Sequence, residues 1–115
     1  QLKKINKLTK IRQNIAKRYF NEIIIDEKMP FDNRCAYHLY WIRVKNRKKF
    51  RELLDKKHIE TGTHYRPIHT FTLYKNNTSL PFTEKIGNEI VTIPIHPNLK
   101  KIEIDKIIST INKSV

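Results

Sequence analysis

Residues 36–65 run AYHLYWIRVKNRKKFRELLDKKHIETGTHY, and their pattern predicts a strand, a helix and a second strand with little chain between them. The first strand is expected over residues 36–44. Alternate positions form two faces, one with Tyr37, Leu39 and Trp41 and the other with Ala36, His38, Tyr40, Ile42 and Val44. Because both faces are largely apolar, we expect a central strand covered on both sides, with His38 hydrogen-bonded in the core.

The helix of this unit is expected at about residues 47–57, because Asn46 is a favourable N-cap residue. Phe50, Leu53 and Leu54 would form its buried stripe. The chain then leads through Ile59 into a second short strand that ends near residue 65.

Two further helices flank this unit in the sequence. Apolar residues recur every three or four positions at the start of the chain, which predicts a long helix over residues 2–25. Pro81 suits the first turn of another helix, in which Phe82, Ile86 and Ile90 would share one face.

The end of the chain completes the expected fold. Residues 91–95 (VTIPI) predict a strand that lies at an edge or is bulged, because Pro94 cannot donate a ladder hydrogen bond. A last helix is expected at about residues 100–113, with a buried stripe formed by Ile104, Ile107, Ile108 and Ile111. The fold class is therefore α/β (α+β): a small three- to four-stranded mixed sheet packed with helices.

The composition indicates one domain with a basic surface. The chain has 115 residues and a formal net charge of +13, which is typical of proteins that bind anionic partners. Lysine supplies 17 of the 24 basic residues, and isoleucine (18) and asparagine (10) are also frequent while alanine (2) is rare. This combination indicates a coding bias. Because lysine is spread along the chain and a phosphate-binding cluster would more naturally use arginine, solvated helix faces are favoured over such a cluster.

The chain also carries signals about its compartment and its completeness. Cys35 is the single cysteine, and no signal peptide or membrane-spanning run is present, so a cytoplasmic location is expected. Residue 1 is Gln rather than Met, and a helical period begins at once, which predicts that a larger protein precedes it.

The stretch 59–69 (IETGTHYRPIH) is the main candidate for a functional loop. It contains one of only two glycines in the chain, and Gly62 permits a positive φ or a close approach of another group. Two histidines, a tyrosine and an arginine follow within seven residues. The alternative is a surface turn that happens to be rich in histidine.

No complete active site is evident from the residues alone. His64 and His69 lie five positions apart, and the zinc-binding spacings that need three or four ligands are missing. No Gly-rich phosphate loop is present, and the carboxylates show no pairing typical of acid–base catalysis. His96 is expected to fix a turn rather than to act on a substrate.

Three groups of residues, in this order and spacing, closely resemble the C-terminal small domain of the DegT-type sugar aminotransferases. They are YHLYWIRV (37–44) with NRKKFR (46–51), GTHY (62–65) with PIH (67–69), and LP (80–81) with EK (84–85) before IPIHPNL (93–99). The first helix also resembles the long helix that leads into that domain. The resemblance implies pyridoxal phosphate (PLP) enzymes of the aspartate aminotransferase fold, with residues 1–30 leading in from a missing large domain and residues 31–115 forming the small domain.

The resemblance implies an activity. Members of this family transfer an amino group from an amino acid, usually glutamate, to a keto group of a nucleotide-linked sugar, and the PLP cofactor carries the chemistry. No lysine of this chain lies in a stretch that resembles the family's PLP lysine, so the chain alone is expected to be inactive. The complete protein is expected to be a homodimer, because family sites form between subunits.

The resemblance also implies substrate-binding residues, namely His64 and Tyr65, followed by His69, with Arg66 as a candidate for the diphosphate. Imidazole and phenol groups can hydrogen-bond sugar hydroxyls, and a guanidinium makes bidentate phosphate contacts. Arg66 departs from the family pattern, and a solvated side chain is an equal alternative. The rival hypothesis for the whole chain is a basic binding module for an anionic partner such as nucleic acid, which the missing recognition motif disfavours.

Overall fold

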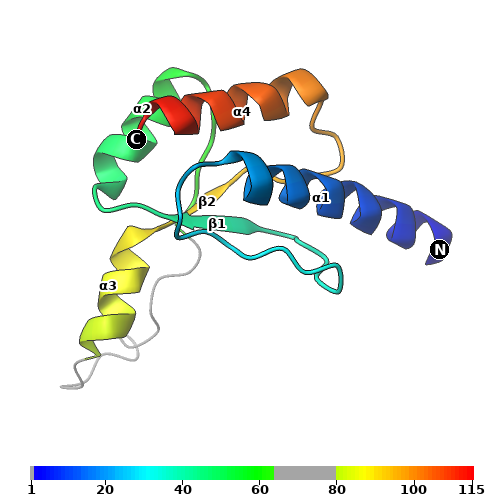
Figure 1. The fold of residues 1–115 in the computed structure, drawn as a ribbon, viewed down its shortest axis with the longest axis horizontal. Coiled ribbons are helices and arrows are strands. Elements are labelled where there is room, and N and C mark those ends of the chain that lie inside the picture. The colour runs from blue at the N-terminus through cyan, green and yellow to red at the C-terminus, as the bar shows by residue number, and fades with distance from the viewer. Residues whose placement is uncertain (1, 64–79) are drawn as a thin grey trace.

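The computed structural model describes residues 2–63 and 80–115, which form four helices and two strands. In chain order these are α1 (Leu2–Glu22), β1 (Tyr40–Arg43), α2 (Arg47–Lys56), α3 (Pro81–Glu89), β2 (Ile90–Ile93) and α4 (Lys101–Lys113). Figure 1 shows α1 and α4 side by side on one side of the two strands, whereas α3 extends away from the opposite side. The expected combination of a small sheet with helices is confirmed.

The sheet is smaller and simpler than expected. β1 and β2 pair antiparallel, with Tyr40 opposite Ile93 and Ile42 opposite Val91. Single antiparallel bridges add Lys28 beside Ile42 and Gly62 beside Thr92. Within the described ranges, four chain segments therefore lie side by side, but only two are regular strands and every pairing is antiparallel. The expected three- to four-stranded mixed sheet is corrected accordingly.

β1 is four residues long rather than nine, and it begins late because the chain turns at Tyr37, which has a φ of 53°. A left-handed residue interrupts the alternation of an extended strand, so Tyr37 and Tyr40 both enter the core although they are three positions apart. His38 follows the turn and is exposed, so its expected place in the core was wrong.

Three tyrosines connect the core to the surrounding chain. Tyr19 of α1 and Tyr40 of β1 place their ring centroids 5.3 Å apart, and both side chains are buried. Their hydroxyls donate to the backbone carbonyls of Pro94 and Met29, each at 2.6 Å. The Tyr37 hydroxyl donates to the carbonyl of Pro30 at 2.8 Å and accepts from the amide of Asp32 at 2.6 Å. Burial raises the pKa of Tyr19 and Tyr40 above its ordinary value, which keeps their hydroxyls protonated as donors.

The helices confirm most of the expected stripes. Ile15, Ala16 and Tyr19 of α1 are buried, as are all four isoleucines predicted for α4. α1 ends at Glu22 rather than residue 25, and its first turns project beyond the rest of the fold, leaving Leu2 and Ile5 exposed (Figure 1). α4 begins at Lys101, where the Glu103 carboxylate accepts the backbone N–H of Lys100 at 2.9 Å.

α3 differs from its expected packing. Pro81 occupies the first turn as predicted, but no residue of this helix is buried and Phe82 is 73% exposed. α3 extends away from the layer formed by α1 and α4 (Figure 1), so the face expected to be buried has little of the described chain to pack against. β2 follows α3 directly and ends before Pro94, in keeping with the missing proline donor.

Candidate functional site

The four residues predicted to bind the substrate, His64, Tyr65, Arg66 and His69, lie outside the described residues. The structure does describe the chain on either side of them. Residues 58–63 lead up to this stretch, and Leu80 with α3 follows it. The geometry of these two flanking segments is therefore what the structure contributes to the candidate site.

The leading segment begins at the end of α2, which has the hydrogen bonds of a Schellman motif. The amide of His58 donates to the carbonyl of Asp55 and that of Ile59 to the carbonyl of Leu54, both at 2.9 Å. His58 takes the left-handed conformation that this motif requires, with a φ of 60°. Ile59 is buried, and the chain continues toward β2.

Two further interactions hold the leading segment after Ile59. Arg51 of α2 donates from Nε to Thr61 Oγ1 at 2.8 Å and from Nη2 to the Thr61 carbonyl at 3.0 Å. Gly62 and Thr92 exchange backbone hydrogen bonds of 3.0 and 2.9 Å. Gly62 has no positive φ, so the first of the two possibilities expected from the sequence is wrong, and its backbone forms an antiparallel bridge to β2.

The following segment is held at the carboxyl end of α3. Arg47 of α2 donates from Nη1 to the carbonyl of Gly87 at 2.5 Å, and the amide of Val44 donates to the carbonyl of Glu89 at 2.9 Å. Arg43 of β1 forms an ion pair with Glu89 at 2.6 Å and a second one with Glu27. The last turn of α3 is thereby attached to both α2 and β1.

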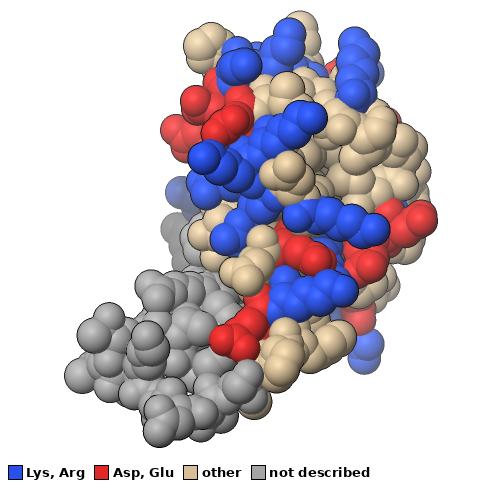
Figure 2. Space-filling model, turned by 90° about the vertical axis from the view of Figure 1, so that its left-hand side faces the viewer, with Lys and Arg blue, Asp and Glu red and all other residues tan. Residues whose placement is uncertain are grey.

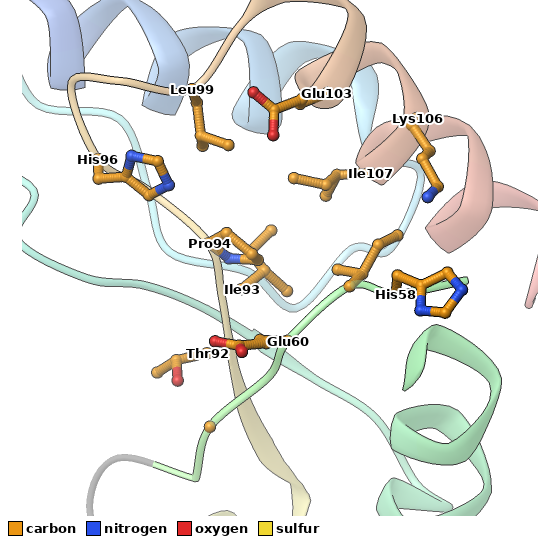
Figure 3. Close-up of a pocket in the computed structure, with 12 residues that line it drawn as sticks. His58, Glu60, Thr92, Ile93, Pro94, His96, Leu99, Glu103, Lys106 and Ile107 are labelled. Carbon is orange, nitrogen blue, oxygen red and sulfur yellow. The ribbon is translucent and has the colours of Figure 1, made fainter. Parts of the chain in front are cut away.

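A cleft of about 510 Å³ opens beside Gly62, between α4 and β2 (Figure 3). Glu103 and Lys106 enter it from α4, His58 and Glu60 from the leading segment, and His96 from the turn after β2. The two histidines lie on opposite sides of the cleft in this view, so they do not form a catalytic pair. The cleft is polar, but it shows no arrangement typical of nucleophilic or acid–base catalysis.

The backbone of His96 takes part in the turn that the sequence predicts. Its carbonyl accepts the amide of Leu99 at 3.2 Å, closing the turn that connects β2 to α4. Among residues 2–63 and 80–115, no three histidine, cysteine or carboxylate side chains come together as a metal site would require.

The lysines of the described ranges do not fit the PLP-binding lysine of an aminotransferase. Such a lysine reacts as a free amine. Burial or a neighbouring charge lowers the pKa of its ammonium group and so increases the fraction of free amine. Every described lysine except Lys28 is exposed, and the half-buried Lys28 donates from Nζ to the carbonyl of Ile25 at 2.8 Å. Within the described ranges, no lysine side chain is buried.

The charged surface agrees with solvated helix faces. On the face shown in Figure 2, Lys and Arg side chains lie among acidic and uncharged ones rather than in one continuous patch. None of the described helices is both long and apolar enough to span a membrane.

The interactions that hold the two flanking segments were not foreseen from the sequence. Arg47 and Arg51 are four residues apart, so they lie on one face of α2 and reach different segments. The four-residue spacing was the available signal, but it does not reveal which segments the side chains contact.

Comparison with known proteins gives a consistent family match. Residues 1–112 match the model of the DegT/DnrJ/EryC1/StrS aminotransferase family. A curated relative, dTDP-3-amino-3,6-dideoxy-alpha-D-galactopyranose transaminase of Aneurinibacillus thermoaerophilus, is 31% identical over 113 residues, covering 89% of this chain and 30% of the relative.

Solved structures agree in fold. An aminotransferase of this family from Brucella abortus is 30% identical with a TM-score of 0.78, covering 93% of this chain and 31% of that one. The Streptococcus pneumoniae protein Spr1654, assigned as a sugar aminotransferase and solved in its PLP form, is 26% identical with a TM-score of 0.87, covering 98% and 32%. The chain thus spans about a third of the length of these relatives, and the expected likeness to part of a fold-type I aminotransferase is confirmed.

Proposed function

Since the chain belongs to the DegT/DnrJ/EryC1/StrS aminotransferase family, we propose that it is the C-terminal part of a PLP-dependent sugar aminotransferase. The proposed reaction transfers an amino group from an amino acid, glutamate in our proposal, to the keto group of a nucleotide-linked sugar. The family match over residues 1–112 carries this proposal. The named activity of the Aneurinibacillus relative, a dTDP-sugar transaminase, supports the substrate class.

In the proposed arrangement, residues 1–30 lead in from a large domain and residues 31–115 form the small domain. PLP supplies the amino-transfer chemistry when bound, and the large domain holds it. The length of the match supports this division, because the chain spans about a third of the relatives it resembles. The chain alone is proposed to be inactive, and the complete protein is proposed to be a homodimer.

The residues proposed to contact the sugar are His64, Tyr65 and His69, with Arg66 near the diphosphate. Their side chains offer hydrogen bonds to hydroxyls and, for arginine, a bidentate match to phosphate. The chain enters this stretch from Thr61 and Gly62, which are held against α2 and β2 by the hydrogen bonds described above.

The decisive experiment measures steady-state kinetics in the complete protein with a nucleotide-linked ketosugar and glutamate. We expect His64→Ala and Tyr65→Phe each to lower kcat/KM for the ketosugar by about tenfold, the loss typical of one substrate hydrogen bond. His38→Ala is the matched control, because His38 is exposed and far from the proposed site in sequence. An unchanged kcat/KM for the ketosugar in both site variants would remove these residues from the substrate site.

A further inference from the structure

Arg12 of α1 has a buried donor atom without a partner. Its Nε is buried, and no acceptor lies within hydrogen-bond distance of it. Each of the other arginines in residues 2–63 and 80–115 donates at least one hydrogen bond. A buried charged group without a partner is costly, so native structures normally supply one. The exception at Arg12 indicates a partner outside the described residues.

Arg12 lies on the face of α1 that packs on the core further along the helix. An α-helix turns by about 100° per residue, which places Arg12 on the same face as Ala16 and Tyr19. The side chains of these two residues are completely buried. Toward the start of the helix, the same face continues through the apolar residues Leu8 and Ile5. The apolar face of α1 therefore extends on both sides of Arg12.

The part of this face before Arg12 lies beyond the described fold. The first turns of α1 project past the other elements (Figure 1), and Leu2 and Ile5 are 79% and 57% exposed. Directly after Arg12 the helix is attached, because Gln13 donates from Nε2 to the carbonyl of Asn33 at 2.7 Å. Arg12 thus lies at the boundary between the attached part of α1 and the part that projects.

The other charges of α1 indicate what kind of partner fits this face. The five lysines of the helix are exposed, and none lies within about 60° of Arg12 around the helix axis. A phosphate or nucleic acid would be held by several cations. A single arginine among apolar residues is instead typical of a protein interface, where its guanidinium pairs with a carboxylate. The face therefore fits an apolar protein surface with one acidic side chain.

We propose that Arg12 donates to a carboxylate of the large domain, and that Leu2, Ile5 and Leu8 pack against apolar residues around that carboxylate. This inference rests on the proposed function, which places a large domain before residue 1. The chain spans about a third of the length of its relatives, so most of a protein of that length is available to cover this face. The guanidinium stays charged, so a partner of opposite charge offsets its burial.

The first measurement is the accessibility of this face in the complete protein. Ile5→Cys and Lys7→Cys are labelled with a maleimide, and the urea-denatured proteins give the intrinsic reactivity of each thiol. Lys7 is the matched control, because it is exposed and lies about 200° around the helix from Ile5. We expect the corrected rate at Ile5→Cys to be at least about tenfold lower than at Lys7→Cys, the protection expected when an apolar side chain is buried.

The second measurement tests Arg12 itself. Arg12→Met keeps a long apolar side chain but leaves the proposed carboxylate unpaired. Added to Ile5→Cys, it should accelerate labelling about tenfold, the effect of losing a hydrogen bond between charged groups. Arg12→Lys keeps the charge but has no Nε donor, so it should give an intermediate rate. Lys10→Met is the matched control on the same helix and should leave the rate within about twofold.

Three results would overturn the proposal. Equal corrected rates at Ile5→Cys and Lys7→Cys would show that the face is open. Slow labelling that Arg12→Met leaves unchanged would show that Arg12 is not the anchor. Protection that arises only after inorganic phosphate or a nucleotide-linked ketosugar is added would assign Arg12 to an anionic ligand. The proposed function fails separately, through absent amino transfer to the ketosugar in a complete protein that still protects Ile5→Cys.

Discussion

His58 occupies a backbone position at which a side chain is unfavourable. Its φ of 60° places it at the left-handed residue of the Schellman motif that ends α2, where glycine is usual. For a residue with a Cβ atom, this conformation costs about 1–2 kcal/mol. Part of that cost is recovered by histidine, because glycine loses more conformational entropy on folding.

We therefore predict that His58→Gly raises the free energy of unfolding by about 0.5–1 kcal/mol, measured by urea denaturation. The side chain is exposed, so no core packing is lost with it. His38→Gly is the matched control, because His38 is also exposed but has no positive φ, and it should be neutral or destabilising. A loss of stability in His58→Gly would contradict the strain assigned to this residue.

The backbone conformation of Tyr37 could not be predicted from the sequence. Its left-handed φ is supported by two hydrogen bonds of its hydroxyl to the backbone at Pro30 and Asp32, within the loop that precedes it. The alternation of residues 36–44 predicts a continuous strand, and a pattern of apolar residues carries no sign of such a turn. The error at His38 follows directly, since the turn changes which side chains face the core.

At the scale of elements, α3 and α4 have similar apolar periodicity but different surroundings. Ile104, Ile107, Ile108 and Ile111 of α4 are all buried, and the periodicity predicted each of them. The same reasoning failed for α3, where Phe82 and Ile86 recur at helical spacing but no residue is buried. Periodicity predicts that a helix has an apolar face. Burial of that face also requires a neighbouring element that covers it.

This difference predicts unequal effects of substitution. Ile107→Ala, in the core between α4 and the sheet, should lower the free energy of unfolding by about 2–5 kcal/mol through lost burial and a cavity. Phe82→Ser should change it by no more than about 0.5 kcal/mol, because Phe82 is 73% exposed. Urea denaturation of the chain 1–115 measures both. A large loss in Phe82→Ser would show that α3 has packing partners that the described residues do not include.

At the scale of the whole molecule, the order of the helices follows well from the sequence. The strand expected to end near residue 65 is only a single bridge at Gly62 within the described residues, and the pairing was not predicted. The helix positions were predicted to within a few residues, because caps and prolines mark their ends: Asn46 accepts the amide of Lys49, and Pro81 begins α3. The second bridge, between Gly62 and Thr92, joins residues thirty positions apart. Local pattern cannot specify such a contact, and the same holds for the contacts of Arg47 with α3 and of Arg51 with Thr61.

For the candidate site, too, one part was predicted from the sequence and another part came only from the structure. Its proposed substrate-binding residues came from the family resemblance, and no arrangement in the described ranges would have identified them independently. The structure adds the flanking geometry, in which polar contacts hold the end of α3, whereas the leading segment is held both by the buried Ile59 and by the hydrogen bonds of Arg51 to Thr61.

The distribution of lysines leads to a prediction about the cofactor. Stable PLP binding requires a lysine with a lowered pKa and donors for the phosphate, whereas the described lysines are exposed, apart from the half-buried Lys28 with its backbone partner. We expect chain 1–115, mixed with PLP and passed through gel filtration, to lose the cofactor absorbance, and the complete protein to retain it. Bovine serum albumin treated in parallel controls for weak attachment to surface lysines. Retention of one PLP per chain by residues 1–115 would contradict the proposed division, because the cofactor site would then lie within this part of the protein.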